Sequence, residues 1–146
     1  MATIFTIGYT KKSLEQFIHH LQEAEVDAVI DVRLRNTSQL AGFAKRDDLA
    51  YLLRGCFGIE YEHRPDLAPT PDIREAYKVS GDWAVYERSF LAHLEEGQAE
   101  DTGRELLAQF ERPCLLCAEP VADQCHRRLV AEWWEKHLPS IQVAHL

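Results

Sequence analysis

The chain has 146 residues, 46% of them hydrophobic, which suits one globular domain with a real core, and we expect residues 1–146 to form it. Its net charge of −8 argues against tight non-specific binding of nucleic acid, but leaves room for a small anion in a local basic pocket. No apolar run approaches the roughly 18 residues of a membrane span, no secretory signal is evident, and we expect a cytoplasmic protein with its four cysteines as free thiols.

The N-terminal half of the sequence predicts three strands and two helices. Short β-branched or apolar runs that end in turn or charged residues indicate strands at residues 4–7, 27–33 and 58–64. Apolar side chains spaced three and four apart indicate helices at residues 13–21 and 47–55. Ser13 and Gln16 form a capping box at the start of the first helix, and Asp47 or Asp48 caps the second.

The C-terminal half predicts more helix than strand. Three prolines make residues 65–71 a loop. Helical spacing then predicts four helices, at residues 72–79, 82–96, 102–110 and 123–138. The remaining strands fall at residues 114–118 and 141–146. The order of elements therefore predicts an α/β fold: a single three-layer domain with a mostly parallel sheet of about five short strands and helices on both faces.

Reactive side chains gather where the predicted strands end. Parallel α/β sheets bind ligands beyond the carboxyl ends of their strands, so groups that follow different strands meet at one edge. The groups that fall there are Gly8, Tyr9, Thr10, Asp31, Arg33, His63, Cys117, Glu119, Cys125, His126, Arg127 and Arg128. Singly, each of them is more often structural than functional. A cluster of cysteine, histidine, glutamate and arginine in one strand–loop–helix segment instead indicates a site.

The first interpretation of this cluster is a thiol site. Cys125 and His126 are expected at a helix N-terminus, where the helix dipole stabilises a thiolate, so we expect Cys125 to have a lowered pKa and to react faster than Cys114 or Cys56. One of Cys117 and Cys125 is then the nucleophile or redox partner. His126 acts as general acid or base. Four further residues have expected roles. Glu119 carries protons, Asp31 orients groups or exchanges protons, and Arg33 and Arg127 hold an anion.

A metal site and a site without chemistry are the alternatives. Cys117, Cys125 and His126 supply donors that suit zinc or another divalent metal. Cys114 is excluded from that set, because side chains three residues apart on a strand point to opposite faces. In the interpretation without chemistry, the basic residues bind a partner. The net negative charge of the chain disfavours nucleic acid as that partner without ruling it out.

The motifs TIGYT, IDVR, SQLAGF, GIEY and LCAE followed by CHRR occur in this order along nearly the whole chain. Together they resemble the bacterial and archaeal family catalogued as domain of unknown function number 488. The resemblance implies an intracellular α/β protein with a cysteine–histidine site and brings no established reaction. It implies a site that contains Gly8, Tyr9, Asp31, Arg33, Ser38, Phe43, Tyr61, Cys117, Glu119, Cys125, His126 and Arg127. Of these, we expect Gly8, Tyr9, Arg33, Ser38 and Arg127 to contact the ligand.

Two further comparisons limit this resemblance. Family members often have a proline shortly after the DVR triplet, whereas this chain continues through Leu34 to Thr37, so it resembles a subgroup with its own DVRLRNTSQLAGF loop. IDVR also resembles the rhodanese-like fold, but the span from Cys117 to Arg127 is too long for that fold's tight loop, which leaves sulfur transfer as a minor alternative. We therefore expect a small cytoplasmic enzyme that acts on a small anionic substrate, such as a nucleotide or phosphate ester. A non-catalytic metal-binding or interaction module is the runner-up.

Overall fold

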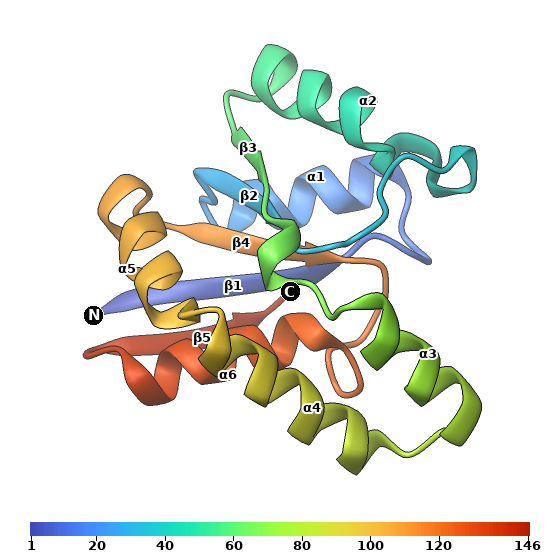
Figure 1. The fold of residues 1–146 in the computed structure, drawn as a ribbon. Helices are drawn as coiled ribbons and strands as arrows, with labels where there is room; N and C mark the ends of the chain where they lie inside the picture. The colour runs from blue at the N-terminus through green and yellow to red at the C-terminus, as the bar shows by residue number, and fades with distance from the viewer.

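The computed structural model describes all of residues 1–146 and contains one sheet of five parallel strands (Figure 1). The order of strands across the sheet is β3-β2-β4-β1-β5. The strands are β1 (Ala2–Gly8), β2 (Ala28–Asp31), β3 (Glu60–His63), β4 (Pro113–Cys117) and β5 (Ile141–His145). The predicted α/β class is confirmed, and the sheet is parallel throughout.

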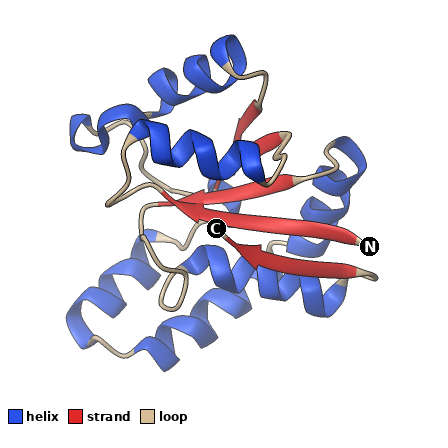
Figure 2. Cartoon of the chain, turned by 180° about the vertical axis from the view of Figure 1, so that it is seen from behind, coloured by secondary structure: helices blue, strands red, loops and turns tan.

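Six α-helices connect the strands. They are α1 (Leu14–Glu23), α2 (Arg46–Tyr51), α3 (Pro71–Ser80), α4 (Trp83–Glu96), α5 (Ala99–Gln109) and α6 (His126–His137). A π-helix (Leu52–Cys56) extends α2, and short 3-10 helices lie at Gln39–Ala44 and Pro65–Leu67. Helices α1 and α2 pack on one face of the sheet, and α4, α5 and α6 pack on the other (Figures 1 and 2). No helix is both long and apolar enough to cross a membrane.

The alternation of side chains along each strand divides the core into two halves. On β4, Leu115 and Cys117 join the cluster under α4–α6, whereas Cys114 and Leu116 join the cluster under α1 and α2. This alternation confirms that Cys114 and Cys117 point to opposite faces, as the period of two along a strand requires.

Three predicted helix starts are wrong, and one of them is that of α5, which begins at Ala99 and not at residue 102. Helix α6 begins at His126 and not near Asp123, because the chain between β4 and α6 runs as a loop and Cys125 has an extended backbone. Helix α2 begins at Arg46, and its N-cap residue Lys45 makes no side-chain cap. The capping box of Ser13 is present as predicted.

The position of β4 between β1 and β2 creates the site. The chain leaves β1 and β2 toward the α1 face and leaves β4 toward the α6 face, so the loops diverge at the carboxyl end of β4 (Figure 1). Divergence of this kind opens a crevice at the carboxyl edge of α/β sheets.

Candidate functional site

A cavity of about 770 Å³ opens at this carboxyl edge. Its floor is formed by the end of β4 and the start of α6, and its walls by the loops after β1 and β2 and by helices α3 and α4. The lining residues are Tyr9, Arg33, Leu34, Arg35, Pro69, Pro71, Asp72, Arg74, Glu75, Tyr77, Lys78, Trp83, Tyr86, Cys117, Ala118, Glu119, Gln124, Cys125 and His126. This volume lies within the usual range for small-molecule sites.

Cys117 is the last residue of β4 and lies beside Gly8 of β1. A methyl group on Gly8 would collide with the backbone carbonyl of Glu119, so only glycine lets the loop after β4 pass this close to β1. The backbone N–H of Tyr9 donates to the carbonyl of Cys117 at 3.3 Å and extends the pairing of the two strands into their loops. Gly8 therefore supports the site without lining the cavity.

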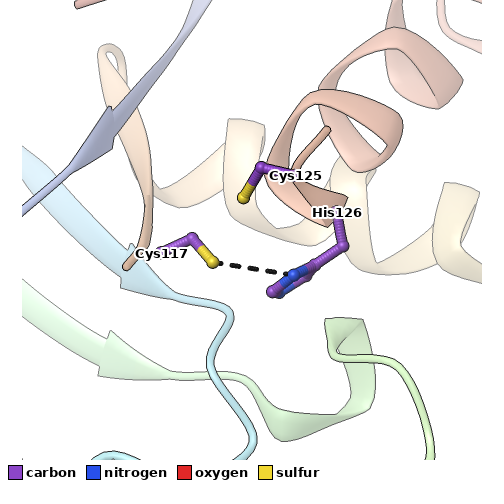
Figure 3. Close-up of side chains that lie close together, drawn as sticks. All are labelled: Cys117, Cys125 and His126. Carbon is purple, nitrogen blue, oxygen red and sulfur yellow. Dashed lines mark hydrogen bonds between the residues drawn. The ribbon is translucent and has the colours of Figure 1, made fainter. Parts of the chain in front are cut away.

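Cys117, Cys125 and His126 point toward one another at the cavity floor (Figure 3). Their donor atoms all lie within 4.8 Å of one another, and the side chains are buried. The Sγ of Cys117 lies 3.6 Å from Nδ1 of His126. Both cysteines are free thiols, and their approach shows that the loop after β4 folds back over the end of the strand.

The second ring nitrogen of His126 fixes the protonation of the first. Its Nε2 lies 2.6 Å from the carbonyl oxygen of Val32, and a carbonyl oxygen can only accept a hydrogen bond. Nε2 therefore carries a proton, which leaves Nδ1 of the neutral ring as an acceptor directed at the Cys117 thiol. A thiol site of this kind combines a nucleophile, a base that takes its proton and a group that orients the base.

The two neighbouring thiols differ in acidity. A hydrogen bond from the Cys125 thiol lowers the pKa of Cys117, and the N–H groups of Ala118 and Glu119 and the charge of Arg127 help to outweigh the effect of burial. Donating that hydrogen bond raises the pKa of Cys125, and burial raises it further. Cys117 is thus the more acidic thiol of the pair, and the Cys125 thiol is its hydrogen-bond donor.

The prediction that Cys125 has the lowered pKa is therefore wrong. Cys125 is the N-cap residue of α6, but its side chain makes no capping hydrogen bond, and it lies against the sulfur of Cys117 instead. Burial raises the pKa of Cys114, in agreement with its predicted inertness. Cys56 is exposed.

Asp31 lies beneath the cavity in a second buried network. Its carboxylate accepts two hydrogen bonds of 2.8 Å from Nε and Nη2 of Arg33, and further ones from Tyr61 at 2.5 Å and Asn36 at 2.9 Å. Burial alone would raise the pKa of Asp31, but these donors, Arg33 foremost, hold it below its usual value. Asp31 is fully buried and does not line the cavity, so it holds Arg33 in place.

The remaining predicted residues fall into two groups. Tyr9, Arg33 and Glu119 line the cavity as expected. Arg127 does not line it: its fully buried guanidinium donates to the hydroxyl of Thr6 and the carbonyl of Glu119. Ser38 is exposed and caps the short 3-10 helix at Leu40. Both residues therefore lie outside the contact surface available to a ligand in the cavity.

Sequence reasoning missed one wall of the cavity. Helices α3 and α4 contribute eight lining residues: Pro71, Asp72, Arg74, Glu75, Tyr77, Lys78, Trp83 and Tyr86. The helical stripe that contains Trp83 and Tyr86 was visible in the sequence, but the sequence could not show what this stripe faces. The network around Asp31 likewise contains Asn36, which lies in the predicted polar loop.

The three groups at the floor also fit a metal ion. Zinc–sulfur and zinc–nitrogen bonds of about 2.3 and 2.1 Å at a tetrahedral angle separate the two donor atoms by about 3.6 Å. The distance between Cys117 Sγ and His126 Nδ1 is 3.6 Å. A backbone carbonyl that accepts from the other ring nitrogen, as that of Val32 does, is the usual outer partner of a metal-bound histidine. Cys117, Cys125 and His126 could therefore hold zinc with a fourth position open to the cavity.

The fold and the site together define a single α/β domain with a buried cysteine–histidine cluster at the carboxyl edge of a parallel sheet. The sequence profile of the family described as Domain of unknown function DUF488 matches residues 13–134, so the chain belongs to this family. No curated protein and no solved structure matches the chain.

Proposed function

We propose that the chain is a small cytoplasmic enzyme that acts on a small anionic substrate, of the nucleotide or phosphate-ester kind, with Cys117 as its nucleophile. The observation that carries this proposal is the arrangement of Cys117 Sγ, 3.6 Å from Nδ1 of a His126 ring whose Nε2 is bound to the carbonyl of Val32. The same cavity that gives access to the thiol is lined by several basic side chains.

Each group at the floor has a definite role in such chemistry. His126 Nδ1 accepts the proton of the Cys117 thiol, and the resulting thiolate forms a bond to an electrophilic atom of the substrate. The proton on His126 then passes to the leaving group. Cys125 donates a hydrogen bond to the thiolate, and Glu119, at the rim, is placed to exchange protons with solvent.

The anion is held by the basic side chains of the cavity. Arg33 is fixed by Asp31 and presents the rest of its guanidinium to the cavity, so it binds an anionic oxygen without losing much side-chain freedom. Arg127 lies outside the cavity lining. It donates a hydrogen bond to the carbonyl of Glu119 and adds positive charge near the sulfur of Cys117.

Alkylation rates measured for each cysteine test the nucleophile. We expect iodoacetamide at neutral pH to label Cys117 faster than the exposed Cys56, as followed by mass spectrometry of the digested protein. The variant His126→Gln should slow the labelling of Cys117, and the matched variant His137→Gln, on the far end of α6, should not. Equal labelling of Cys117 in both variants would remove His126 from the mechanism.

A zinc-binding module without catalysis is the second candidate, because the distance between Cys117 Sγ and His126 Nδ1 fits two ligands of a tetrahedral ion and Cys125 lies beside them. In that case Cys117 labels slowly until a chelator is added. Zinc titration with a colorimetric chelator should then give one ion per chain, and Cys117→Ser should abolish it. Fast labelling of Cys117 that is unaffected by chelator would reject this candidate.

A further inference from the structure

Helix α3 forms one wall of the cavity although it contributes no fully buried residue to the core. Ile73 and Tyr77 are its only side chains that pack against the core, while Arg74 and Lys78 face the cavity. The helix is well capped, by Thr70 at its start and by Gly81 in the left-handed conformation at its end. Its sequence thus builds a stable wall whose polar face is directed at the site.

Aromatic rings continue this wall onto α4. Trp83 and Tyr86 stack at 4.8 Å between ring centroids with 21° between their planes, and Tyr77 meets Trp83 edge-on at 5.7 Å. All three residues line the cavity, and Tyr77 and Trp83 keep part of their surface exposed. Partly exposed rings beside a cavity offer a stacking surface to a flat ligand.

Arg33 supplies a fixed donor in the same cavity. The residue is only 5% exposed, and its Nε and Nη2 are bound to Asp31 and to the carbonyl of Ala44. Its Nη1 makes no hydrogen bond within the chain, so two N–H donors of a buried, immobile guanidinium remain free for a ligand. Such a group suits a phosphate or carboxylate oxygen.

The lining of the cavity is less acidic than the chain as a whole. Four basic and three acidic side chains line the cavity, whereas the whole chain has 16 basic and 24 acidic residues. Three of these basic residues, Arg35, Arg74 and Lys78, have no ion-pair partner. Asp72, Glu75 and Glu119 of the lining have no ion-pair partner either, so an anion is attracted by the cations that it contacts and not by the net charge of the lining.

We propose that the cavity binds a nucleoside monophosphate, with its base against Tyr77 and Trp83 and its phosphate on Arg33. This inference rests on the proposed function, which requires a small anionic substrate, and it specifies the chemical class of that substrate. A sugar phosphate or inorganic phosphate would satisfy Arg33 but would leave the aromatic wall unused. A cavity of about 770 Å³ has room for a mononucleotide.

Calorimetric titration of the purified chain tests this class directly. The probes are AMP, GMP, CMP and UMP, with adenosine, ribose 5-phosphate and inorganic phosphate as partial ligands. We expect at least one nucleotide to bind about tenfold more tightly than ribose 5-phosphate, because stacking of one base contributes about 1–3 kcal/mol. Equal affinity for that nucleotide and ribose 5-phosphate, or no nucleotide binding at all, would overturn the inference.

Matched variants separate the two recognition elements. Trp83→Leu should weaken the nucleotide about tenfold and leave ribose 5-phosphate unchanged, whereas Trp133→Leu, outside the cavity, should change neither. Tyr77→Leu serves as a second variant if Trp83→Leu unfolds. Arg74→Gln should weaken both phosphate ligands several-fold, and the unpaired but distant Arg88→Gln should not. Loss of nucleotide binding in the control variants alone would place the ligand elsewhere.

The labelling rate of Cys117 distinguishes this inference from the proposed function. Fast labelling without nucleotide binding overturns the ligand class and leaves the nucleophile in place. Nucleotide binding with slow labelling of Cys117, with and without chelator, supports the ligand class and overturns the nucleophile. When both hold, the bound nucleotide should protect Cys117 from iodoacetamide, because both occupy the same cavity.

Discussion

Two buried polar clusters lie next to each other at the carboxyl edge, and they differ in how completely their groups are paired. The carboxylate of Asp31 accepts hydrogen bonds from Arg33, Asn36 and Tyr61, and no partner is missing. The Cys117 cluster is also buried, but it borders the cavity, and the hydrogen bond between its two cysteines lowers the pKa of Cys117 and raises that of Cys125. The fully paired carboxylate of Asp31 holds the fold, whereas the thiols that border the cavity are available for chemistry.

The two clusters are joined through the backbone after β2. The carbonyl of Val32 accepts from His126, and the next carbonyl, that of Arg33, accepts from His63 at 2.7 Å. The rigid Asp31 network therefore sets the position of the base that faces Cys117. We therefore expect substitutions in the Asp31 network to reduce the stability of the fold and substitutions in the Cys117 cluster to change the reactivity of the thiols.

The largest loss of stability is expected from Asp31→Asn. The substitution leaves the buried Arg33 guanidinium without a charged partner, which typically costs about 3–5 kcal/mol. The measurement is the free energy of unfolding from urea denaturation followed by circular dichroism. As a control, Asp47→Asn breaks the exposed ion pair with Arg46 and should cost no more than about 1 kcal/mol. A loss of less than that in Asp31→Asn would mean that the network does not hold the fold.

A smaller loss is expected from Gly8→Ala. The added methyl group must push the backbone of Glu119 away from β1, and overpacking of this kind costs about 1–3 kcal/mol. Gly55→Ala is the matched control: its methyl group meets only ordinary contacts with the Tyr51 ring, so stability should stay level or rise slightly. Equal effects of the two substitutions would show that the close approach at Gly8 does not constrain the loop.

The smallest loss of stability is expected from lowering the pH. The pKa of Asp31 is lower in the folded chain than in the unfolded one, so its stabilising contribution is complete above the unfolded value of about 3.9 and is lost as the pH falls through the folded value. The wild-type chain should therefore lose stability more steeply than Asp31→Asn between about pH 4 and the acid limit of folding. Urea midpoints measured across this range compare the two, and parallel curves would contradict the lowered pKa.

The layout of the fold could be predicted from the sequence because its signals are local. Short apolar runs indicated β1 and β4, and helical spacing with the capping box of Ser13 indicated α1. The approach of Cys117 and Cys125 also followed, since carboxyl ends of parallel strands share one edge. Strand order could not be predicted, because it depends on how the crossovers pack and leaves no mark in any one segment.

The ionisation of the two thiols could not be predicted for a related reason. It depends on the path of residues 118–125, which places Cys125 Sγ against Cys117 and not against the first turn of α6. The direction of Arg127 depends on the same path, since its guanidinium binds the carbonyl of Glu119. The pKa of a thiol depends on the positions of charges and donors within a few ångströms, and the order of residues in the sequence does not give these positions.

We propose that Cys117, held by Cys125 and His126, is the first thiol of the site to ionise. The most direct test of this proposal is the absorbance of thiolate at 240 nm, measured across pH in the wild-type chain and in Cys117→Ala and Cys125→Ala. We expect one thiolate that forms below the ordinary thiol pKa of about 8.5, is absent in Cys117→Ala, and forms at higher pH in Cys125→Ala. A low-pH thiolate that persists in Cys117→Ala but disappears in Cys125→Ala would contradict it.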